Sequence, residues 1–346
     1  MKLYPFLFEP NLHPVIWGGQ RLCQYKGLPP TEEPIGESWE ISGVPTSTSI
    51  VANGKWAGCD LNTVISQAPA DILGKAVNEK YHGQMPLLVK FIDAQKDLSI
   101  QVHPNDDMAQ RVHGKMGKNE MWYIIDAQPG SCLYAGFNKE ITPDELRKHV
   151  EEGTITEVLA RHKVSKGDVF YLPAGRVHAI GAGIFLAEVQ QSSDVTYRIY
   201  DYNRKGMDGK PRELHVDLAA QALDYHVDAD YRTAYSDRLN KASLVIDSPD
   251  FTVRVTEMTA PFHRNLLKYD SFVACMCIEG DCLLHPKDAD SMIELHHGES
   301  CLVPAALADY IVTPLTGRTK ILETFINNMD TSLMGTLTRI LHINFD

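Results

Sequence analysis

The sequence predicts a mainly β protein built from two small antiparallel barrels of the jelly-roll type, with short helical insertions. Three observations carry this prediction. Most of the chain consists of short apolar or alternating segments separated by Gly, Pro and Asn/Asp turns. The chain lacks a regular strand–helix alternation, which disfavours a doubly wound parallel sheet. The pattern of segment 166–174 also recurs at 297–305.

Six segments are predicted as strands because each is short, rich in apolar residues and bounded by turn residues. The segment 98–104 alternates strictly, which places Ser99, Gln101 and His103 on one face and apolar side chains on the other. The predicted strands are 86–93, 98–104, 121–125, 168–173, 185–190 and 195–200.

Helices are few and are predicted as insertions. Thr142 and Glu145 form a capping box with Pro143 at the first helical position, and this helix is expected to end near Gly153. A second helical segment covers 60–80 with an interruption near Pro69. A third covers 213–223, where we expect it to close the first domain and lead into the second.

The repeated segment is the main clue to domain organisation. Residues 166–174 and 297–305 both read Gly-acid, four strand residues, then Pro-Ala, which resembles the second motif of a cupin, a jelly-roll barrel. At the same offset Asp309 stands where the first copy has His178. We therefore expect a catalytic cupin barrel with helical insertions over 1–240. The segment 241–346 is expected to form a second cupin-like barrel without metal.

Charge limits the possible partners. The 346 residues carry a formal charge of −12, which disfavours nucleic acid and anionic membranes as partners. A phosphorylated metabolite would need a local positive cluster or a metal ion. No apolar run is long enough for a membrane span, and we expect a monomer or a weak homodimer.

The cysteines do not indicate a disulfide or thiolate site. The seven cysteines form an odd set without a CxxC pair, and the N-terminal residues do not form a credible signal peptide. We therefore expect reduced, mostly buried thiols in a cytoplasmic protein.

Four polar residues on separate predicted elements are candidate metal ligands. Two imidazoles, one carboxylate and one amide oxygen suit a zinc ion with one position left for water or substrate. Manganese or ferrous iron would accept the same donors, so the ligand types alone leave the metal open. The candidate ligands are Gln101, His103, Glu120 and His178.

Several of these segments resemble motifs of the class I mannose-6-phosphate isomerases. Residues 98–104 and 117–121 resemble the paired metal-site motifs, and 173–175 followed by His178-Ala179 resembles the third ligand segment. Residues 188–198 are similar to the acid-to-arginine segment, and 17–19 and 36–40 to the opening motifs. The resemblance covers residues 1 to about 225 and is looser in the rest of the chain. Within the family, the chain resembles the short bacterial form of the enzyme.

The resemblance implies an enzyme that interconverts mannose 6-phosphate and fructose 6-phosphate with one bound Zn²⁺ per chain. It implies that the four candidate ligands hold this zinc ion. It further implies that Ser99, Lys118 and Arg198 line the sugar-phosphate site, and that Glu188 and Arg198 lie beside the reacting carbons. Lys118, Arg198 and the metal would supply the local positive charge, with Arg204 as a further candidate.

The sequence departs from the longer family members directly after Arg198. Residues 199–204 replace the Ala-Gly continuation of those forms. Phosphate contacts beyond Arg198, and a strict requirement for phosphate, therefore stay open at this point.

The isomerisation explains why these residue types are needed. Moving a proton between C1 and C2 passes through an enediol, whose developing negative charge requires a fixed positive charge such as zinc or Arg198. A base must reach this proton, and Glu188 is the candidate, with Lys118 as a further catalytic candidate.

Other activities fit part of this pattern. An isomerase of unphosphorylated hexoses would use the same residues, although Lys118 and Arg198 argue mildly against it. A non-catalytic sugar-binding regulatory cupin would not need the complete set of ligands, acid and arginine. A cupin oxygenase could hold ferrous iron with two histidines and a carboxylate.

Overall fold

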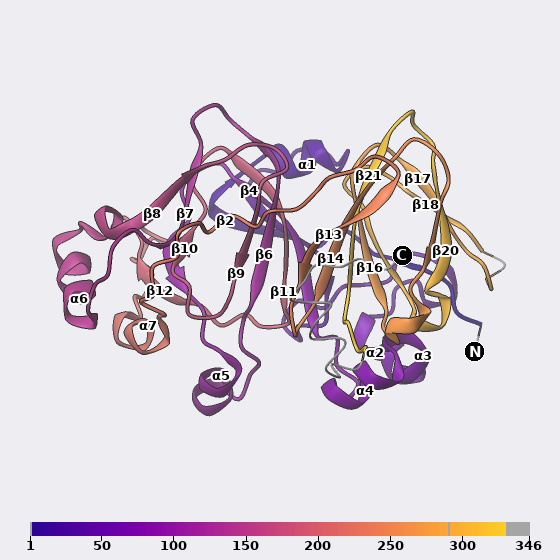
Figure 1. The fold of residues 1–346 in the computed structure, drawn as a ribbon, viewed down its shortest axis with the longest axis horizontal. Helices are drawn as coiled ribbons and strands as arrows, with labels where there is room; N and C mark the ends of the chain where they lie inside the picture. Colours follow the sequence, from indigo (N-terminus) through magenta and orange to yellow (C-terminus); the bar gives the residue numbers. More distant parts are fainter. Residues whose placement is uncertain (1, 290, 330–346) are drawn as a thin grey trace. The chain divides into compact units, whose positions relative to one another are not determined.

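The computed structural model describes residues 2–289 and 291–329, which form two compact units (Figure 1). The central unit consists of Pro10–Ser47 and Pro86–Ala234. The terminal unit consists of the residues up to Glu9, Thr48–Met85 and the chain from Tyr235 onward.

The central unit contains two antiparallel sheets. The six-stranded sheet has the order β2 (Leu12–Gly19), β3 (Ile35–Ser42), β4 (Leu87–Ala94), β11 (Ile184–Gln191), β6 (Glu120–Ala127) and β9 (Val169–Leu172). The five-stranded sheet has the order β12 (Tyr197–Tyr200), β5 (Ile100–Val102), β10 (His178–Ala179), β7 (Cys132–Phe137) and β8 (Leu159–Lys163). Trp122 and Leu186 from the first sheet share a buried apolar cluster with Leu133 and Ala135 from the second.

The terminal unit also contains two antiparallel sheets. Its six-stranded sheet has the order β1 (Phe6–Leu7), β19 (Ser300–Val303), β16 (Val273–Glu279), β21 (Thr319–Phe325), β14 (Thr252–Met258) and β13 (Lys241–Asp247). Its four-stranded sheet has the order β15 (Phe262–Asn265), β20 (Asp309–Pro314), β17 (Cys282–Pro286) and β18 (Ile293–Leu295). The prediction of a mainly β protein with two jelly-roll units is confirmed.

The two units share one strand order. Strands β3-β4-β11-β6-β9 of the central unit correspond to β13-β14-β21-β16-β19 of the terminal unit. Likewise β5-β10-β7-β8 correspond to β15-β20-β17-β18. The repeated segment falls on corresponding strands: β9 and β19 begin at Val169 and Ser300, and β10 and β20 begin with the same spacing at His178 and Asp309. The repeat in the sequence therefore marks a repeated topology.

The helices agree with the sequence in part. The helices are α1 (Arg21–Tyr25), α2 (Leu61–Gln67), α3 (Pro69–Leu73), α4 (Lys75–Tyr81), α5 (Asp106–His113), α6 (Pro143–Glu152) and α7 (Val216–Ala222). Helix α6 has the predicted capping box at Thr142 and ends at Gly153 in a left-handed conformation. Helix α7 begins at Val216 rather than at Glu213, and α1 and α5 were not predicted.

The units do not follow the expected division at residues 240 and 241. Strand β1 and the helices α2, α3 and α4 belong to the terminal unit, although they precede most of the central unit in sequence. Strand β1 pairs with β19. The carboxylate of Asp270 accepts hydrogen bonds from the backbone amides of Lys75 and Ala76 at the start of α4. These pairings join positions far apart in sequence, so local patterns do not reveal them.

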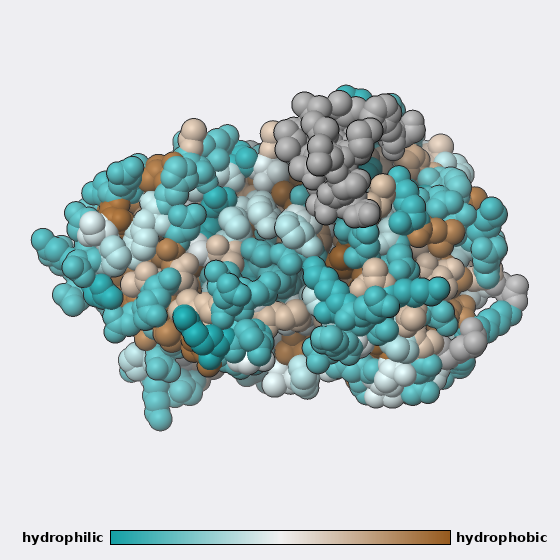
Figure 2. All heavy atoms as spheres, turned by 60° about the horizontal axis from the view of Figure 1, so that its bottom comes forward, coloured by the Kyte–Doolittle hydropathy of each residue, from teal (hydrophilic) through white to brown (hydrophobic). Residues whose placement is uncertain are grey.

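Figure 2 shows a face of the molecule that is mostly hydrophilic, with apolar residues scattered among hydrophilic ones. None of the described helices is both long and apolar enough to cross a membrane.

Candidate active site

The candidate site lies inside the central unit, where polar side chains interrupt an otherwise apolar interior. Strands β4 and β11 are buried along their full length, and Lys90 lies directly opposite Glu188 in their pairing. On the other side of β11, Glu188 lies opposite Trp122 of β6. Directly paired residues share a face of the sheet. The three side chains therefore form one row across its centre.

A cavity of about 200 Å³ opens beside this row. Ser99 and Gln101 line it from the segment that contains β5, and Glu188 lines it from β11. Lys118 and Arg198 complete the predicted residues on its wall. Five residues that the sequence assigned to substrate, metal or proton transfer therefore surround one cavity.

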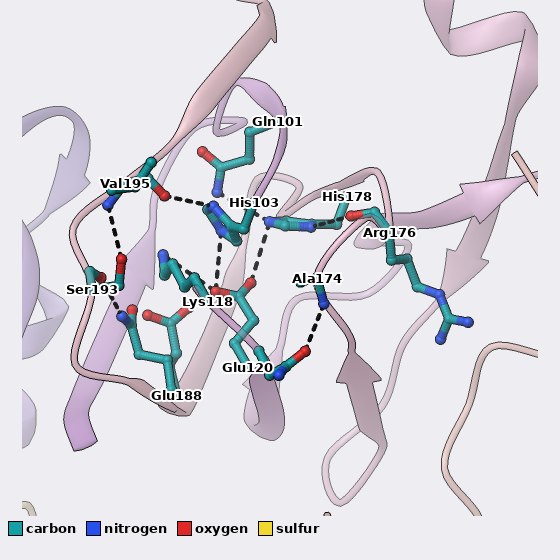
Figure 3. A network of polar contacts seen from close by, with 12 residues as sticks. Gln101, His103, Lys118, Glu120, Ala174, Arg176, His178, Glu188, Ser193 and Val195 are labelled. Atoms are coloured by element: carbon teal, nitrogen blue, oxygen red, sulfur yellow. Dashed lines mark hydrogen bonds and ion pairs between the residues drawn. The ribbon is translucent and has the colours of Figure 1, made fainter. Parts of the chain in front are cut away.

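Three further predicted residues converge next to it, as Figure 3 shows. The carboxylate of Glu120 lies between two imidazoles, with Oε2 at 3.3 Å from His103 Nε2 and Oε1 at 3.2 Å from His178 Nε2. All three side chains are at most 1% exposed. Their donor atoms lie within 4.8 Å of one another. The cluster is therefore compact enough to surround one ion.

Backbone carbonyls orient both imidazoles. His103 Nδ1 lies 3.0 Å from the carbonyl oxygen of Val195, and His178 Nδ1 lies 2.9 Å from that of Arg176. A carbonyl oxygen only accepts hydrogen bonds, so each Nδ1 must carry the proton. Both Nε2 atoms then present lone pairs toward the Glu120 carboxylate, which is the arrangement of metal-binding histidines.

Electrostatics support a cation at this point. Burial lowers the pKa of His103 to about 3, and the positive charge of Lys118 acts in the same direction. Burial also lowers the pKa of His178. Burial opposes ionisation of Glu120, but Lys118 and the two histidines hold its pKa well below the usual range. Near neutral pH two lone pairs thus face a carboxylate, an arrangement that a cation between them would stabilise.

The hydrogen bonding of these atoms fits an ion site. Within residues 2–289 and 291–329, His103 Nε2 and both oxygens of Glu120 are buried without a hydrogen bond of good geometry. Buried polar groups normally have such a partner unless an ion or water supplies it. The donor set, two imidazoles and a carboxylate, is one that zinc accepts.

Gln101 and the turn before His178 complete the cluster. Strand β5 places Gln101 directly opposite His178, and the amide nitrogen of Gln101 lies 3.3 Å from His178 Nε2. Gly175 adopts a φ of +92°, and a Cβ there would lie 3.0 Å from the carbonyl oxygen of Ala222. The amide of Gly175 donates to the carbonyl of His103. This glycine therefore ties the turn before His178 to the strand of the first histidine.

Glu188 is held by two donors. Trp122 Nε1 donates to Oε2 at 2.9 Å, and Lys90 Nζ lies 3.1 Å from Oε1. Burial acts to lower the pKa of Lys90, but the carboxylates of Glu188 and Glu37 raise it above the usual value. The Glu188 carboxylate thus lies between a charged lysine and an indole N–H donor, and it is the candidate group for proton transfer.

Glu37 and Trp39 form the wall beyond Lys90. Glu37 Oε2 lies 3.3 Å from Lys90 Nζ and accepts a hydrogen bond of 2.6 Å from Trp39 Nε1. Burial opposes ionisation of Glu37, yet Lys90 and Trp39 lower its pKa. Both residues line the cavity, so this wall carries a carboxylate and an aromatic ring.

Arginines gather at another part of the cavity wall. Arg198 and Arg212 line the cavity, whereas Arg204 is absent from the described lining residues. Burial and the charges of Arg212 and Arg204 lower the pKa of Arg198. Arg204 donates to the backbone oxygen of Asp97 and forms an ion pair with Asp201. Arg212 rather than Arg204 is thus the additional arginine at the cavity, and the expectation for Arg204 is corrected.

Four charged residues of the cavity wall received no role from the sequence: Glu37, Lys90, Asp194 and Arg212. A signal for Lys90 existed, because it is the single charged residue in the apolar run 87–92. Glu37 lies in the opening motif 36–40, but no role was assigned to it. Arg212 lies well beyond Arg198 in sequence, and only the folded loop brings it to the cavity.

Family models match both parts of the chain. The type I phosphomannose isomerase catalytic domain matches residues 6–128, and the mannose-6-phosphate isomerase cupin domain matches residues 240–324. Mannose-6-phosphate isomerase ManA of Bacillus subtilis is 33% identical over 313 residues, which are 90% of this chain and 96% of the relative. This chain belongs to the type I phosphomannose isomerase family. The predictions of the family and of an isomerase are confirmed.

Further relatives agree with this assignment. The mannose-6-phosphate isomerase of Streptococcus mutans is 36% identical over 250 residues, which are 72% of this chain and 77% of the relative. The crystal structure of mannose 6-phosphate isomerase from Bacillus subtilis superposes with a TM-score of 0.81 at 31% identity. The match covers 93% of this chain and 99% of the Bacillus subtilis chain. The predicted cupin-like fold is thereby confirmed for this phosphomannose isomerase family member.

Proposed function

We propose that the chain interconverts mannose 6-phosphate and fructose 6-phosphate through an enediol at a zinc site in the central unit. The observation that carries this proposal is the buried donor cluster of His103, Glu120 and His178 next to a cavity lined by Glu188 and Arg198. The family assignment supports the substrate, because the relatives above are named for mannose 6-phosphate.

Gln101, His103, Glu120 and His178 would hold the zinc ion. The donor types of all four residues, the burial of His103, Glu120 and His178, and the orientation of both Nε2 atoms support this role. When bound, the ion would supply positive charge next to the sugar carbonyl and stabilise negative charge that develops on its oxygen.

Glu188 would move the proton between C1 and C2. Lys90 and Trp122 fix the orientation of its carboxylate. The same carboxylate can accept the proton from one carbon and return it to the neighbouring carbon.

Arg198, Lys118 and Ser99 would bind the substrate. Lys118 is buried on the cavity wall, with Nζ at 3.3 Å from Glu120 Oε2. Arg198 donates through Nη1 to the backbone oxygen of Glu213, which fixes the guanidinium at the wall. Its Nε is buried without a hydrogen-bond partner among the described residues. Arg198 therefore keeps donors for the substrate oxygens.

The test is a coupled assay of mannose 6-phosphate turnover by the full chain, before and after treatment with a chelator. We expect turnover that the chelator abolishes and that added Zn²⁺ restores. In D₂O, turnover should also place deuterium at C2 of mannose 6-phosphate. Absence of turnover by the zinc-loaded chain would contradict the proposed function.

A further inference from the structure

We propose that Arg212, held in place by Asp201, is a second residue that binds the phosphate group and so favours phosphorylated over unphosphorylated sugars. This inference rests on the proposed function and extends it. It addresses the segment after Arg198, where the sequence departs from the longer members of the family.

The loop 201–212 folds back on itself and brings its two ends together. Lys205 and Pro211 form an antiparallel bridge, and the amide of Gly206 donates to the carbonyl oxygen of Lys210. Arg204 and Arg212 therefore both reach the carboxylate of Asp201, which is 4% exposed. The loop thus carries two arginines around one buried acid.

Asp201 fixes the plane of the Arg212 guanidinium. Arg212 Nε donates to Oδ2 at 2.8 Å and Nη2 donates to Oδ1 at 2.5 Å. This two-pronged contact uses one edge of the guanidinium and restricts its rotation. Nη1 has no acceptor among residues 2–289 and 291–329 and is free to bind an anion. Arg212 is therefore preorganised without being saturated.

The charge of this group suits a phosphate monoester. Three arginines, Arg198, Arg204 and Arg212, lie close to two carboxylates, Asp201 and Glu213, which leaves these five groups with a net charge of +1. Such clustering of like charges is unfavourable unless an anion neutralises it. A phosphate monoester carries about −1.5 to −2 near pH 7 and would do so.

The two loop arginines have different tasks. Arg212 lines the cavity together with Arg198, whereas the guanidinium of Arg204 is occupied by Asp201 and by the backbone oxygens of Asp97 and Asp201. Arg204 is thus a positioning residue that anchors the loop. Arg212 is the loop residue that can reach a ligand in the cavity.

The test measures kcat and KM of the full chain for mannose 6-phosphate and for mannose. In Arg212→Met the ratio of kcat/KM for the phosphorylated sugar to that for mannose should fall by about tenfold to a hundredfold, mainly through KM, because a charge-assisted hydrogen bond is lost. Arg212→Lys keeps the positive charge but loses the planar guanidinium. Its ratio of kcat/KM values should therefore lie between those of Arg212→Met and wild type. Lys210→Met is the matched control, because it removes an equal charge from an exposed position of the same loop.

A second measurement separates this inference from the proposed function. Inorganic phosphate should bind the wild-type chain and Lys210→Met equally in calorimetry, and Arg212→Met about tenfold or more weakly. If wild type turns over neither sugar, the proposed function fails, and phosphate binding still decides the role of Arg212. Equal phosphate binding and an unchanged ratio in a folded Arg212→Met chain would overturn the inference.

Discussion

The central and terminal units have the same strand order but different interiors. In the central unit His178 lies opposite Gln101, and in the terminal unit Asp309 lies opposite Asn265. Asp309 follows His178 by the same offset that separates the two copies of the repeated segment, and it lies at the same place in its sheet. Both units thus have an amide at one of these paired positions, whereas the histidine is replaced by an acid.

The carboxylate ligand is also replaced. Glu120 pairs with Leu172, and the corresponding residue Val273 pairs with Val303. An apolar side chain therefore occupies the topological position of Glu120. The terminal unit lacks both the carboxylate and the imidazole that would be needed at these positions, which supports the prediction of a barrel without metal.

The terminal unit also has a glutamate at the position that corresponds to Glu188, but the two glutamates have different partners. Glu188 lies opposite Trp122, two residues after Glu120, and Glu323 lies opposite Cys275, two residues after Val273. Glu323 accepts hydrogen bonds from Arg264 Nε at 3.0 and 2.9 Å and from the hydroxyl of Tyr310. The corresponding acid therefore lines a cavity in one unit and closes a buried ion pair in the other.

This comparison teaches how one scaffold supports different tasks. The strand order sets where side chains meet, and the residues at a few paired positions decide whether the interior binds a ligand or fills itself. The predictions below use pairs of corresponding positions, so that each variant in the central unit has a control in the terminal unit.

The largest effect is expected for the histidine position. His178→Ala should lower kcat/KM by roughly a thousandfold or more, because a bound metal supplies several kcal/mol and each 1.36 kcal/mol corresponds to a factor of about ten. Asp309→Ala, at the corresponding position, should change it by less than about twofold. The coupled assay with mannose 6-phosphate measures both. Near-normal activity of His178→Ala would remove this residue from the site.

The next largest loss of turnover is expected at Glu188. Glu188→Gln preserves the shape of the side chain but removes the base, so turnover should fall by roughly a hundredfold to ten-thousandfold while bound metal stays. Deuterium exchange at C2 should be lost as well. Glu323→Gln, at the corresponding position, should keep the turnover per folded chain. Normal turnover in Glu188→Gln would assign proton transfer to another group, such as Lys118.

For the stability of the fold, the variant in the terminal unit should have the larger effect at these two corresponding acid positions. Glu323→Gln leaves the buried guanidinium of Arg264 without its charge partner, and loss of one member of a buried pair costs about 3–5 kcal/mol. Glu188→Gln should cost less, since Lys90 retains Glu37 as a partner. Chemical denaturation of both variants measures the free energy of unfolding. A smaller loss for Glu323→Gln than for Glu188→Gln would contradict the comparison.

Local patterns in the sequence predicted strands β4, β6, β9 and β11 of the central six-stranded sheet, and together with the family resemblance they selected His103, Glu120 and His178, which the structure brings together. Alternation in 98–104 placed Gln101 and His103 on one face, and the repeat matched Asp309 to His178, as the strand starts confirm. Glu120 is the first residue of β6, one position before the predicted strand 121–125.

Features that depend on distant pairings were not predicted. Phe6 of β1 pairs with Leu302 of β19, and no local pattern identifies so distant a partner. The task of Lys90 follows from its pairing with Glu188, and that of Arg212 from the closure of the loop 201–212. Each requires the folded chain, because charge and spacing alone do not set which side chains meet.

The most direct test of this account counts the metal ions bound per chain in wild type, His103→Ala and Asp309→Ala after dialysis. The account predicts one zinc ion in wild type, none in His103→Ala and one in Asp309→Ala. Two ions in wild type, or one ion retained by His103→Ala, would contradict a single metal centre in the central unit.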